Sequence, residues 1–249
     1  MSLLTKIHND KMKGIIKILL AALILLIAIA AVATFMHHDE EIEILDEYTE
    51  VIGKNYNGTV YKITCGNNSS NDTAIVILGV HSLESGIHNA TNDTIMNWTK
   101  NNELDKKYIV YFIKLNYKNS GRNISDYDTN RLMGERLANQ YVVPDIANYD
   151  PYLIVDVHEM EKYWDEQRYV GVLNNDSDIE KEYASKISNA LDYPIFVINA
   201  GTSPKWVTVP LSKTNHTVIL FETAQKDNQT QKMETARGLV RTIDELPVY

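Results

Sequence analysis

Residues 74–90 read AIVILGVHSLESGIHNA, and this stretch decides the expected fold. The apolar run that begins at Ala74 and ends at Gly79 predicts a buried strand. His81 and Glu84 follow where that strand ends, three residues apart. On a tight turn, or on the first turn of a helix, two side chains with this spacing can converge on one point. An imidazole and a carboxylate that converge at a strand end provide half of a zinc site of the catalytic kind.

Two later apolar runs end in side chains that could complete such a site. The segment YLIVDVH ends in His158, and the segment TVILFE ends in Glu222. We therefore expect His81, Glu84 and His158 to bind zinc and to leave a fourth position for water. Glu222 is then the expected general base. The alternative is that each histidine is an ordinary polar residue at the end of a strand.

Two neighbouring polar residues are interpreted from their spacing alone. Asp156 lies two residues before His158, so both side chains project from the same face of the strand. Asp156 can therefore hydrogen-bond a ligand histidine, and a hydrogen bond to the backbone is an equal alternative. His88 lies seven residues after His81 and is expected to face solvent.

The order of these motifs resembles that of the zinc carboxypeptidase superfamily. A His-x-x-Glu element after a strand is followed by an Asn-Arg pair, by a strand that ends in histidine and by a strand that ends in glutamate. The closer branch is the succinylglutamate desuccinylase/aspartoacylase type, in which an arginine precedes an Asp-x-Asn-Arg element. Here Arg122 precedes the sequence DTNR at residues 128–131, and the resemblance runs from about residue 74 to residue 224.

This resemblance implies a cofactor and the roles of three further residues. The cofactor is Zn²⁺, held by the residues named above. Arg122 would stabilise the oxyanion of the reaction, and Asn130 and Arg131 would hold a carboxylate of the substrate. A guanidinium fork suits a carboxylate better than an ammonium group does, because it can donate two parallel hydrogen bonds.

The chain also departs from the deacylase branch. Only 26 residues separate Arg131 from His158, and the 27 residues after Glu222 leave no room for the extra C-terminal β-domain of aspartoacylases. We therefore expect, first, a carboxypeptidase-like hydrolase that cleaves an amide bond next to a free carboxylate. A deacylase of N-acyl amino acids is the second expectation. A non-catalytic surface glycoprotein that keeps the fold is the third.

Runs typical of strands alternate with stretches of helical spacing over the rest of the chain. This alternation predicts an α/β fold, a mixed β-sheet flanked by helices, over residues 59–249. Ligands of such sheets lie outside the carboxyl ends of the strands. The net charge of −9 argues against a nucleic-acid partner, and the single cysteine, Cys65, excludes an intrachain disulfide.

The N-terminal region predicts a membrane anchor. Residues 14–36 are long and apolar enough to form one transmembrane helix. Lysines are concentrated in residues 1–13 and acidic side chains in residues 37–58, so the positive-inside rule places the N-terminus in the cytoplasm. The expected protein is a single-pass cell-membrane protein with a cytoplasmic tail, an acidic juxtamembrane segment and an extracellular catalytic domain. The alternative is a cleaved signal peptide, with AVA at residues 31–33 as its cleavage site.

Glycosylation motifs support export of the domain. Asn-x-Ser/Thr occurs eleven times among 23 asparagines, and every copy follows the expected anchor. This excess predicts an N-glycosylated surface protein, and a local bias toward Asn and Thr is the alternative. At a cell surface the expected substrates are peptides or cell-wall fragments, with N-acyl amino acids for the deacylase alternative.

Overall fold

The computed structural model describes residues 48–116, 127–173, 177–198, 204–214 and 216–249. The expected cytoplasmic tail, the expected transmembrane segment and Arg122 lie outside these ranges. Among the described helices, none combines the length and the apolar character needed to cross a membrane.

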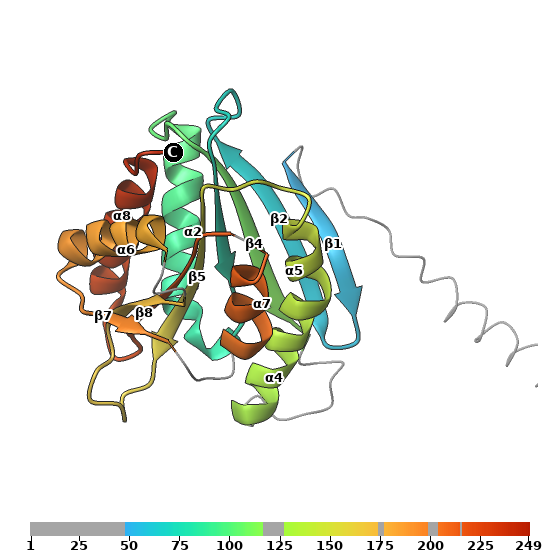
Figure 1. The fold of residues 1–249 in the computed structure, drawn as a ribbon. Helices are drawn as coiled ribbons and strands as arrows, with labels where there is room; N and C mark the ends of the chain where they lie inside the picture. Colours follow the sequence, from blue (N-terminus) through green and yellow to red (C-terminus); the bar gives the residue numbers. More distant parts are fainter. Residues whose placement is uncertain (1–47, 117–126, 174–176, 199–203, 215) are drawn as a thin grey trace, which may run out of the picture. The chain divides into compact units, whose positions relative to one another are not determined.

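One mixed sheet of eight strands forms the centre of the described structure, as expected (Figure 1). The strands along the chain are β1 (Thr49–Asn55), β2 (Gly58–Gly66), β3 (Thr73–Leu78), β4 (Lys107–Leu115), β5 (Leu153–Met160), β6 (Tyr169–Val172), β7 (Ile195–Val197) and β8 (Val218–Ala224). Their order across the sheet is β1-β2-β4-β3-β5-β8-β6-β7. The central strands β4, β3, β5 and β8 are mutually parallel, whereas β2 and β6 pair antiparallel with their neighbours in this group.

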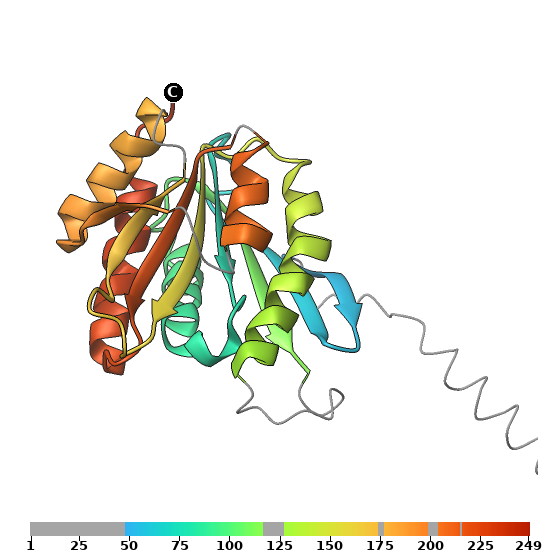
Figure 2. The same ribbon diagram turned by 60° about the horizontal axis from the view of Figure 1, so that its bottom comes forward.

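Helices cover both faces of the sheet (Figure 2). The helices on one face are α2 (Ser85–Lys100), α6 (Asp178–Leu191) and α8 (Gln229–Asp244). Those on the other face are α4 (Tyr127–Leu137), α5 (Val143–Ile146) and α7 (Val209–Ser212), with π-helical turns at Ala138–Val142 and Pro204–Thr208. The sheet therefore buries two apolar layers, and its central strands carry nearly continuous apolar runs.

Successive residues of β3 show how these runs serve both layers. Ile75 and Ile77 pack into the core with α4 and α7, while Val76 and Leu78 pack into the core with α2 and α8. All four side chains are fully buried. Because successive side chains of a strand point to opposite faces, a residue's position along the strand fixes the layer that it enters.

The sheet begins earlier than the sequence predicts. Residues 37–58 were expected to be an acidic juxtamembrane segment, but β1 lies within that range and pairs antiparallel with β2. Glu50 on β1 forms an ion pair of 2.5 Å with Lys62 of β2, whose own side chain is buried. The polar composition of this edge strand hides it from a hydrophobicity pattern, because one of its faces remains partly exposed.

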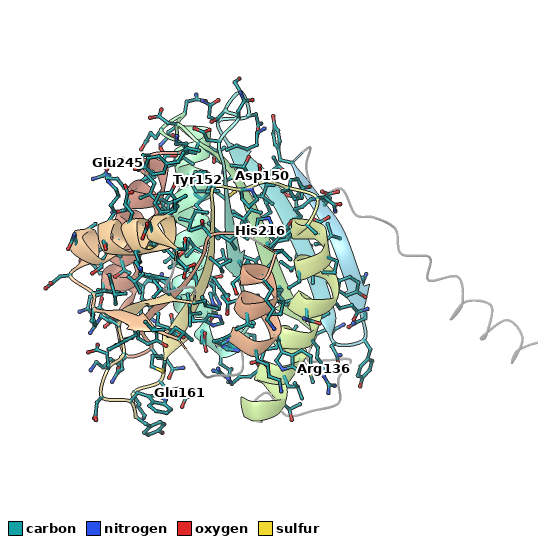
Figure 3. The ribbon with its side chains drawn as sticks, in the orientation of Figure 1. Arg136, Asp150, Tyr152, Glu161, His216 and Glu245 are labelled. Atoms are coloured by element: carbon teal, nitrogen blue, oxygen red, sulfur yellow. The ribbon has the colours of Figure 1, made fainter. Side chains whose placement is uncertain are left out.

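The strand order brings the carboxyl ends of three key strands together. β3, β5 and β8 are consecutive parallel neighbours in the sheet, so they end at the same edge. Figure 3 marks that edge with Glu161, which follows β5, and the opposite edge with Tyr152, which precedes β5. His81, His158 and Glu222 belong to this carboxyl edge.

Candidate metal centre

His81, Glu84 and His158 converge on one point. One ligand atom from each residue lies within 4.8 Å of the others, and all three side chains are buried. Glu84 lies between the imidazoles: its Oε1 is 2.9 Å from His81 Nδ1 and its Oε2 is 2.9 Å from His158 Nδ1. The two rings are tilted with their centroids 4.5 Å apart. The site that sequence spacing suggested is therefore assembled in space.

A sharp turn after β3 directs His81 and Glu84 toward β5. Gly79 has φ of +81°, and a Cβ atom there would lie 2.2 Å from the carbonyl oxygen of Ile113, so only glycine fits. A 3₁₀ turn at Ser82–Glu84 follows, closed by a 3.0 Å hydrogen bond from Glu84 N to His81 O. The tight turn places both side chains on the same side of the chain.

Further contacts fix the Glu84 carboxylate. The backbone N–H of Glu159 donates to Oε2 at 3.1 Å, and Arg131 donates to Oε1 at 3.1 Å. Burial alone would raise the pKa of Glu84, but the imidazoles of His81 and His158 outweigh burial and hold that pKa well below its ordinary value. The carboxylate is therefore ionised and ready to act as a ligand.

His158 carries the complementary charge. Burial would lower its pKa, but the Asp156 and Glu84 carboxylates raise it well above the ordinary value. The site thus attracts positive charge strongly, in the form of protons or of a cation. Two imidazoles and one carboxylate are also the donor set of a catalytic zinc site with one open position, so these residues fit zinc chemically.

A second carboxylate lies behind each imidazole. His158 Nε2 is 3.0 Å from Asp156 Oδ1, and His81 Nε2 is 3.0 Å from Glu135 Oε1. Both carboxylates are almost completely buried. Such outer partners orient the ring of a ligand histidine and raise its basicity. Asp156 was expected from its spacing to His158, whereas Glu135, which lies 54 residues beyond His81 on α4, was not.

Glu222 lies beside this cluster on β8. It occupies the register position opposite His158 and is buried, and its Oε2 makes no hydrogen bond with the residues that the structure describes. Burial, reinforced by the Glu84 carboxylate, raises its pKa to about 8, although His158 and Arg131 act in the opposite direction. A buried carboxyl oxygen without a partner is costly. A cation bound nearby would favour its ionised form.

Helix α4 brings the two residues expected to bind the substrate to the same site. Asn130 is buried, and its Oδ1 accepts a 2.5 Å hydrogen bond from Ser82 Oγ. Arg131 contacts Glu84, and its side chain is 25% exposed, so it lies between the cluster and solvent. Arg122, the third residue implied by the resemblance, lies outside the described residues.

Comparisons with known proteins agree with this geometry at the level of fold. No family model and no curated protein matches the chain. A candidate metallopeptidase from Shewanella denitrificans superposes with a TM-score of 0.57 at 11% identity, over 78% of this chain and 81% of that one. The chain has a metallocarboxypeptidase-like fold. The metallo-carboxypeptidase of Burkholderia cenocepacia gives a TM-score of 0.50 at 10% identity, over 78% of this chain and 63% of that one.

Product-bound Csd4 from Helicobacter pylori gives the same TM-score of 0.50 at 10% identity, over 76% of this chain. The chain spans only 57% of the length of Csd4. These similarities concern the metallocarboxypeptidase-like fold alone. The expected α/β architecture, a mixed sheet flanked by helices, is confirmed. The closer assignment to the desuccinylase/aspartoacylase branch stays a prediction.

His88 was expected in solvent, and that expectation is wrong. The side chain is 1% exposed, and its Nε2 donates a 2.8 Å hydrogen bond to the carbonyl oxygen of Val157. Burial lowers its pKa to about 4, so the ring is neutral at neutral pH. It packs edge-on to His158 at 6.3 Å between centroids, on the side of β5 that faces α2. The apolar periodicity of α2, in which Ile87 and Ala90 are also buried, was the signal that could have located it.

A buried ion pair behind the metal cluster was also missed. Lys232 of α8 donates to Glu159 Oε1 at 2.6 Å, and the same oxygen accepts the backbone N–H of Ile87 at 2.6 Å. The pair therefore joins α8 to the first turn of α2 and to the strand that carries His158. Its partners are distant in sequence, so spacing gave no sign of it.

Proposed function

We propose that this protein is a zinc-dependent hydrolase that cleaves an amide bond next to a free carboxylate, in the manner of a carboxypeptidase. The observation that carries the proposal is the approach of ligand atoms of His81, Glu84 and His158 to within 4.8 Å, with Glu222 in register beside His158. The metallocarboxypeptidase-like fold supports it.

The residues of the chain have distinct tasks in this reaction. A zinc ion held by the three ligands would supply Lewis acidity. Glu222 takes a proton from the attacking water as the water oxygen bonds to the carbonyl carbon. Glu222 then gives a proton to the leaving nitrogen as the C–N bond breaks, so that a carboxylic acid and an amine are released. Its side chain is only 8% exposed.

The substrate carboxylate is assigned to Asn130 and Arg131. Both lie at the cluster, and Arg131 is the partly exposed one, so it can exchange its contact with Glu84 for a ligand. A guanidinium can bind a carboxylate with two parallel hydrogen bonds. Arg122 is proposed as the donor to the oxyanion, on the resemblance alone.

Deacylation of N-acyl amino acids is the second candidate. The arginine that precedes the DTNR element at residues 128–131 favours it, because that order is typical of the desuccinylase/aspartoacylase branch. Such a substrate also carries a free carboxylate beside an amide, so the same residues would serve. A non-catalytic surface glycoprotein is the outcome if neither substrate class reacts.

We also propose that residues 14–36 anchor the protein in the cell membrane, with the N-terminus in the cytoplasm and the domain outside and N-glycosylated.

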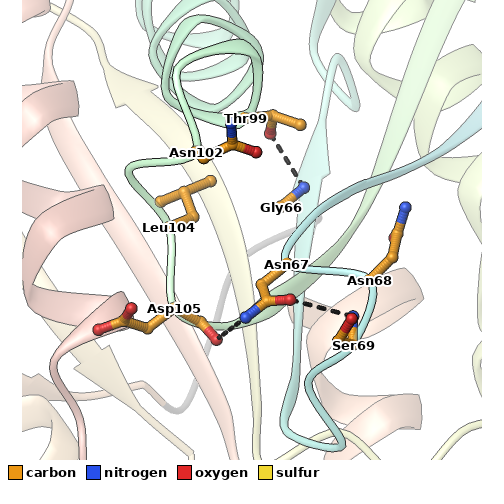
Figure 4. A pocket seen from close by; sticks show the side chains of 8 residues that line it. All are labelled: Gly66, Asn67, Asn68, Ser69, Thr99, Asn102, Leu104 and Asp105. Atoms are coloured by element: carbon orange, nitrogen blue, oxygen red, sulfur yellow. Dashed lines mark hydrogen bonds between the residues drawn. The ribbon is translucent and has the colours of Figure 1, made fainter.

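None of the eight described asparagines in glycosylation motifs is buried. Asn67 and Asn68 line a surface pocket beside Thr99, near the end of α2 (Figure 4). The metal cluster adjoins the other end of α2, its start, and the helix is 16 residues or roughly 24 Å long. Glycans on Asn67 and Asn68 would therefore leave the cluster open. Carbonate extraction should retain the protein in membranes, and release would indicate a cleaved signal.

One assay separates the candidate functions. The full-length protein, purified in detergent and loaded with zinc, is offered peptides with a free C-terminus, the same peptides amidated, and N-acyl amino acids. A carboxypeptidase hydrolyses the first class and leaves the second intact. A deacylase prefers the third. Absence of hydrolysis in all three, from protein with zinc bound, would contradict the proposed activity.

A further inference from the structure

We propose that the edge strand β7 pairs with β7 of a second copy of this chain, so that the two sheets join into one. β7 is the last strand of the sheet, beyond β6 (Figure 1). Its three side chains, Ile195, Phe196 and Val197, are apolar and are 40%, 41% and 46% exposed. Unpaired backbone groups beside exposed apolar side chains are a template for pairing with another chain.

The backbone of β7 offers hydrogen bonds on its outer side. In the parallel ladder with β6, Ile198 N–H donates to Val172 O at 2.9 Å, and Val172 is the register partner of Val197. Val172 therefore bonds to the neighbours of Val197, whose own N–H and C=O groups point away from β6. The same holds for Ile195, the register partner of Val170. Within the described part of the chain, no residue hydrogen-bonds the outward groups of Ile195 or Val197.

The opposite edge of the same sheet is protected against such pairing. β1 carries the charged side chains of Glu50 and Lys54, and its ladder with β2 shifts register between Val51 and Gly53. Charges and bulges on an edge strand keep it from pairing with other chains. β7 has neither of these devices, because its three residues are uncharged and its register with β6 is continuous.

A second copy is the occupant because β7 is complementary to itself. In an antiparallel pair with a two-fold axis at Phe196, Ile195 of each copy faces Val197 of the other and exchanges two hydrogen bonds with it. These pairs use every outward N–H and C=O group of both strands. Phe196 then meets Phe196 of the second copy, and its ring is already held by an edge-on contact with Tyr169, at 5.3 Å between centroids.

Cysteine cross-linking tests this pairing on the full-length protein. The single native cysteine, Cys65, is 2% exposed, so a thiol introduced on β7 is the accessible one. At the axis, the Cα atoms of two Phe196→Cys chains would be about 4.5 Å apart, which a disulfide can span. Those of two Ile195→Cys chains would be roughly 8 Å apart, which is too far. Mild oxidation with diamide should therefore link Phe196→Cys into a dimer and leave Ile195→Cys unlinked.

A mixture and a control sharpen this test. Ile195→Cys and Val197→Cys, purified separately and mixed, should form the mixed disulfide, because these positions face each other at about 5.5 Å in the proposed register. Lys54→Cys, an exposed change on the opposite edge strand β1, is the matched control and measures linkage by chance collision.

Val197→Lys gives β7 a charge of the kind that protects other edge strands. In analytical ultracentrifugation it should raise the dissociation constant of the dimer by about tenfold or more. Phe196→Cys linked no better than Lys54→Cys, Ile195→Cys linked as well as Phe196→Cys, or an unchanged dissociation constant in Val197→Lys overturns the inference. None of these positions belongs to the metal cluster, so such a result leaves the proposed function standing.

Discussion

Glu222 stands directly opposite His158 in the register of the parallel strands β8 and β5. Side chains at matched positions of neighbouring strands project from the same face, and the strands are about 4.8 Å apart. The sheet itself therefore sets the separation between His158, a proposed metal ligand, and Glu222, the proposed base. This is why β8, although it contributes none of the proposed ligands, belongs to the proposed site.

Replacing Glu222 with Gln should separate the base from the ligands. The amide keeps the size of the side chain but cannot accept a proton, so kcat should fall by about 10²–10⁴-fold while zinc stays bound. Turnover of a peptide with a free C-terminus and zinc content are measured on the same sample. Glu234→Gln, on the exposed side of α8, is the control. Equal turnover in the wild type and in Glu222→Gln would contradict the proposed role of Glu222 as general base.

The stability of the zinc-free protein should depend on pH through Glu222. Its pKa is about 8 in the folded state, against about 4.3 in an unfolded chain. Between these values the folded state binds more protons than the unfolded state, so the contribution of Glu222 to the free energy of unfolding falls as pH rises. Glu222→Gln removes this loss. Urea denaturation should show that the free energy of unfolding of the variant rises relative to that of the wild type, by on the order of 2 kcal/mol or more, between about pH 5 and pH 9. A difference independent of pH would contradict the assigned pKa.

Arg131→Lys tests the assigned carboxylate clamp. The lysine keeps the positive charge but loses the planar fork, so substrates with a free carboxylate should bind about tenfold or more weakly. Binding of the amidated peptide, measured as competitive inhibition, should change little. The readout compares KM for the peptide with a free C-terminus with the inhibition constant of the amidated peptide, in the wild type and in the variant. If both peptides bind more weakly by the same factor, Arg131 acts on the metal cluster rather than on the substrate.

The convergence of His81, Glu84 and His158 could be predicted because each side chain follows from its place on a strand end. Parallel strands end at one edge, so residues at their carboxyl ends come together once the strands are neighbours. The three-residue spacing of His81 and Glu84 explains why these two side chains point toward the same place. The fold class followed from the same alternation of strand and helix patterns.

Glu135 and Lys232 could not be found in this way. Each acts on a partner more than 50 residues away, Glu135 on His81 and Lys232 on Glu159, and each lies on a helix surface where a charged residue usually faces solvent. Their burial depends on how α4 and α8 dock on the sheet. That docking is a tertiary property, set for α4 by the contact of Gly134 with Val80.

Breaking the buried ion pair should weaken the whole domain. Lys232→Met leaves the Glu159 carboxylate buried without its cation, which should lower the free energy of unfolding by about 3–5 kcal/mol. Chemical denaturation of the zinc-free protein measures it. Lys226→Met, an exposed change nearby, serves as the control. A loss no larger than in the control would show that Glu159 does not depend on Lys232.

The central claim is that His81, Glu84 and His158 form one zinc site with Glu222 outside its ligand set. Zinc content per chain, determined by elemental analysis of purified full-length protein, tests it most directly. We expect about one zinc ion in the wild type and in Glu222→Gln, and none in His81→Ala or His158→Ala. Zinc retained at full occupancy in both histidine variants, or lost in Glu222→Gln alone, would contradict the claim.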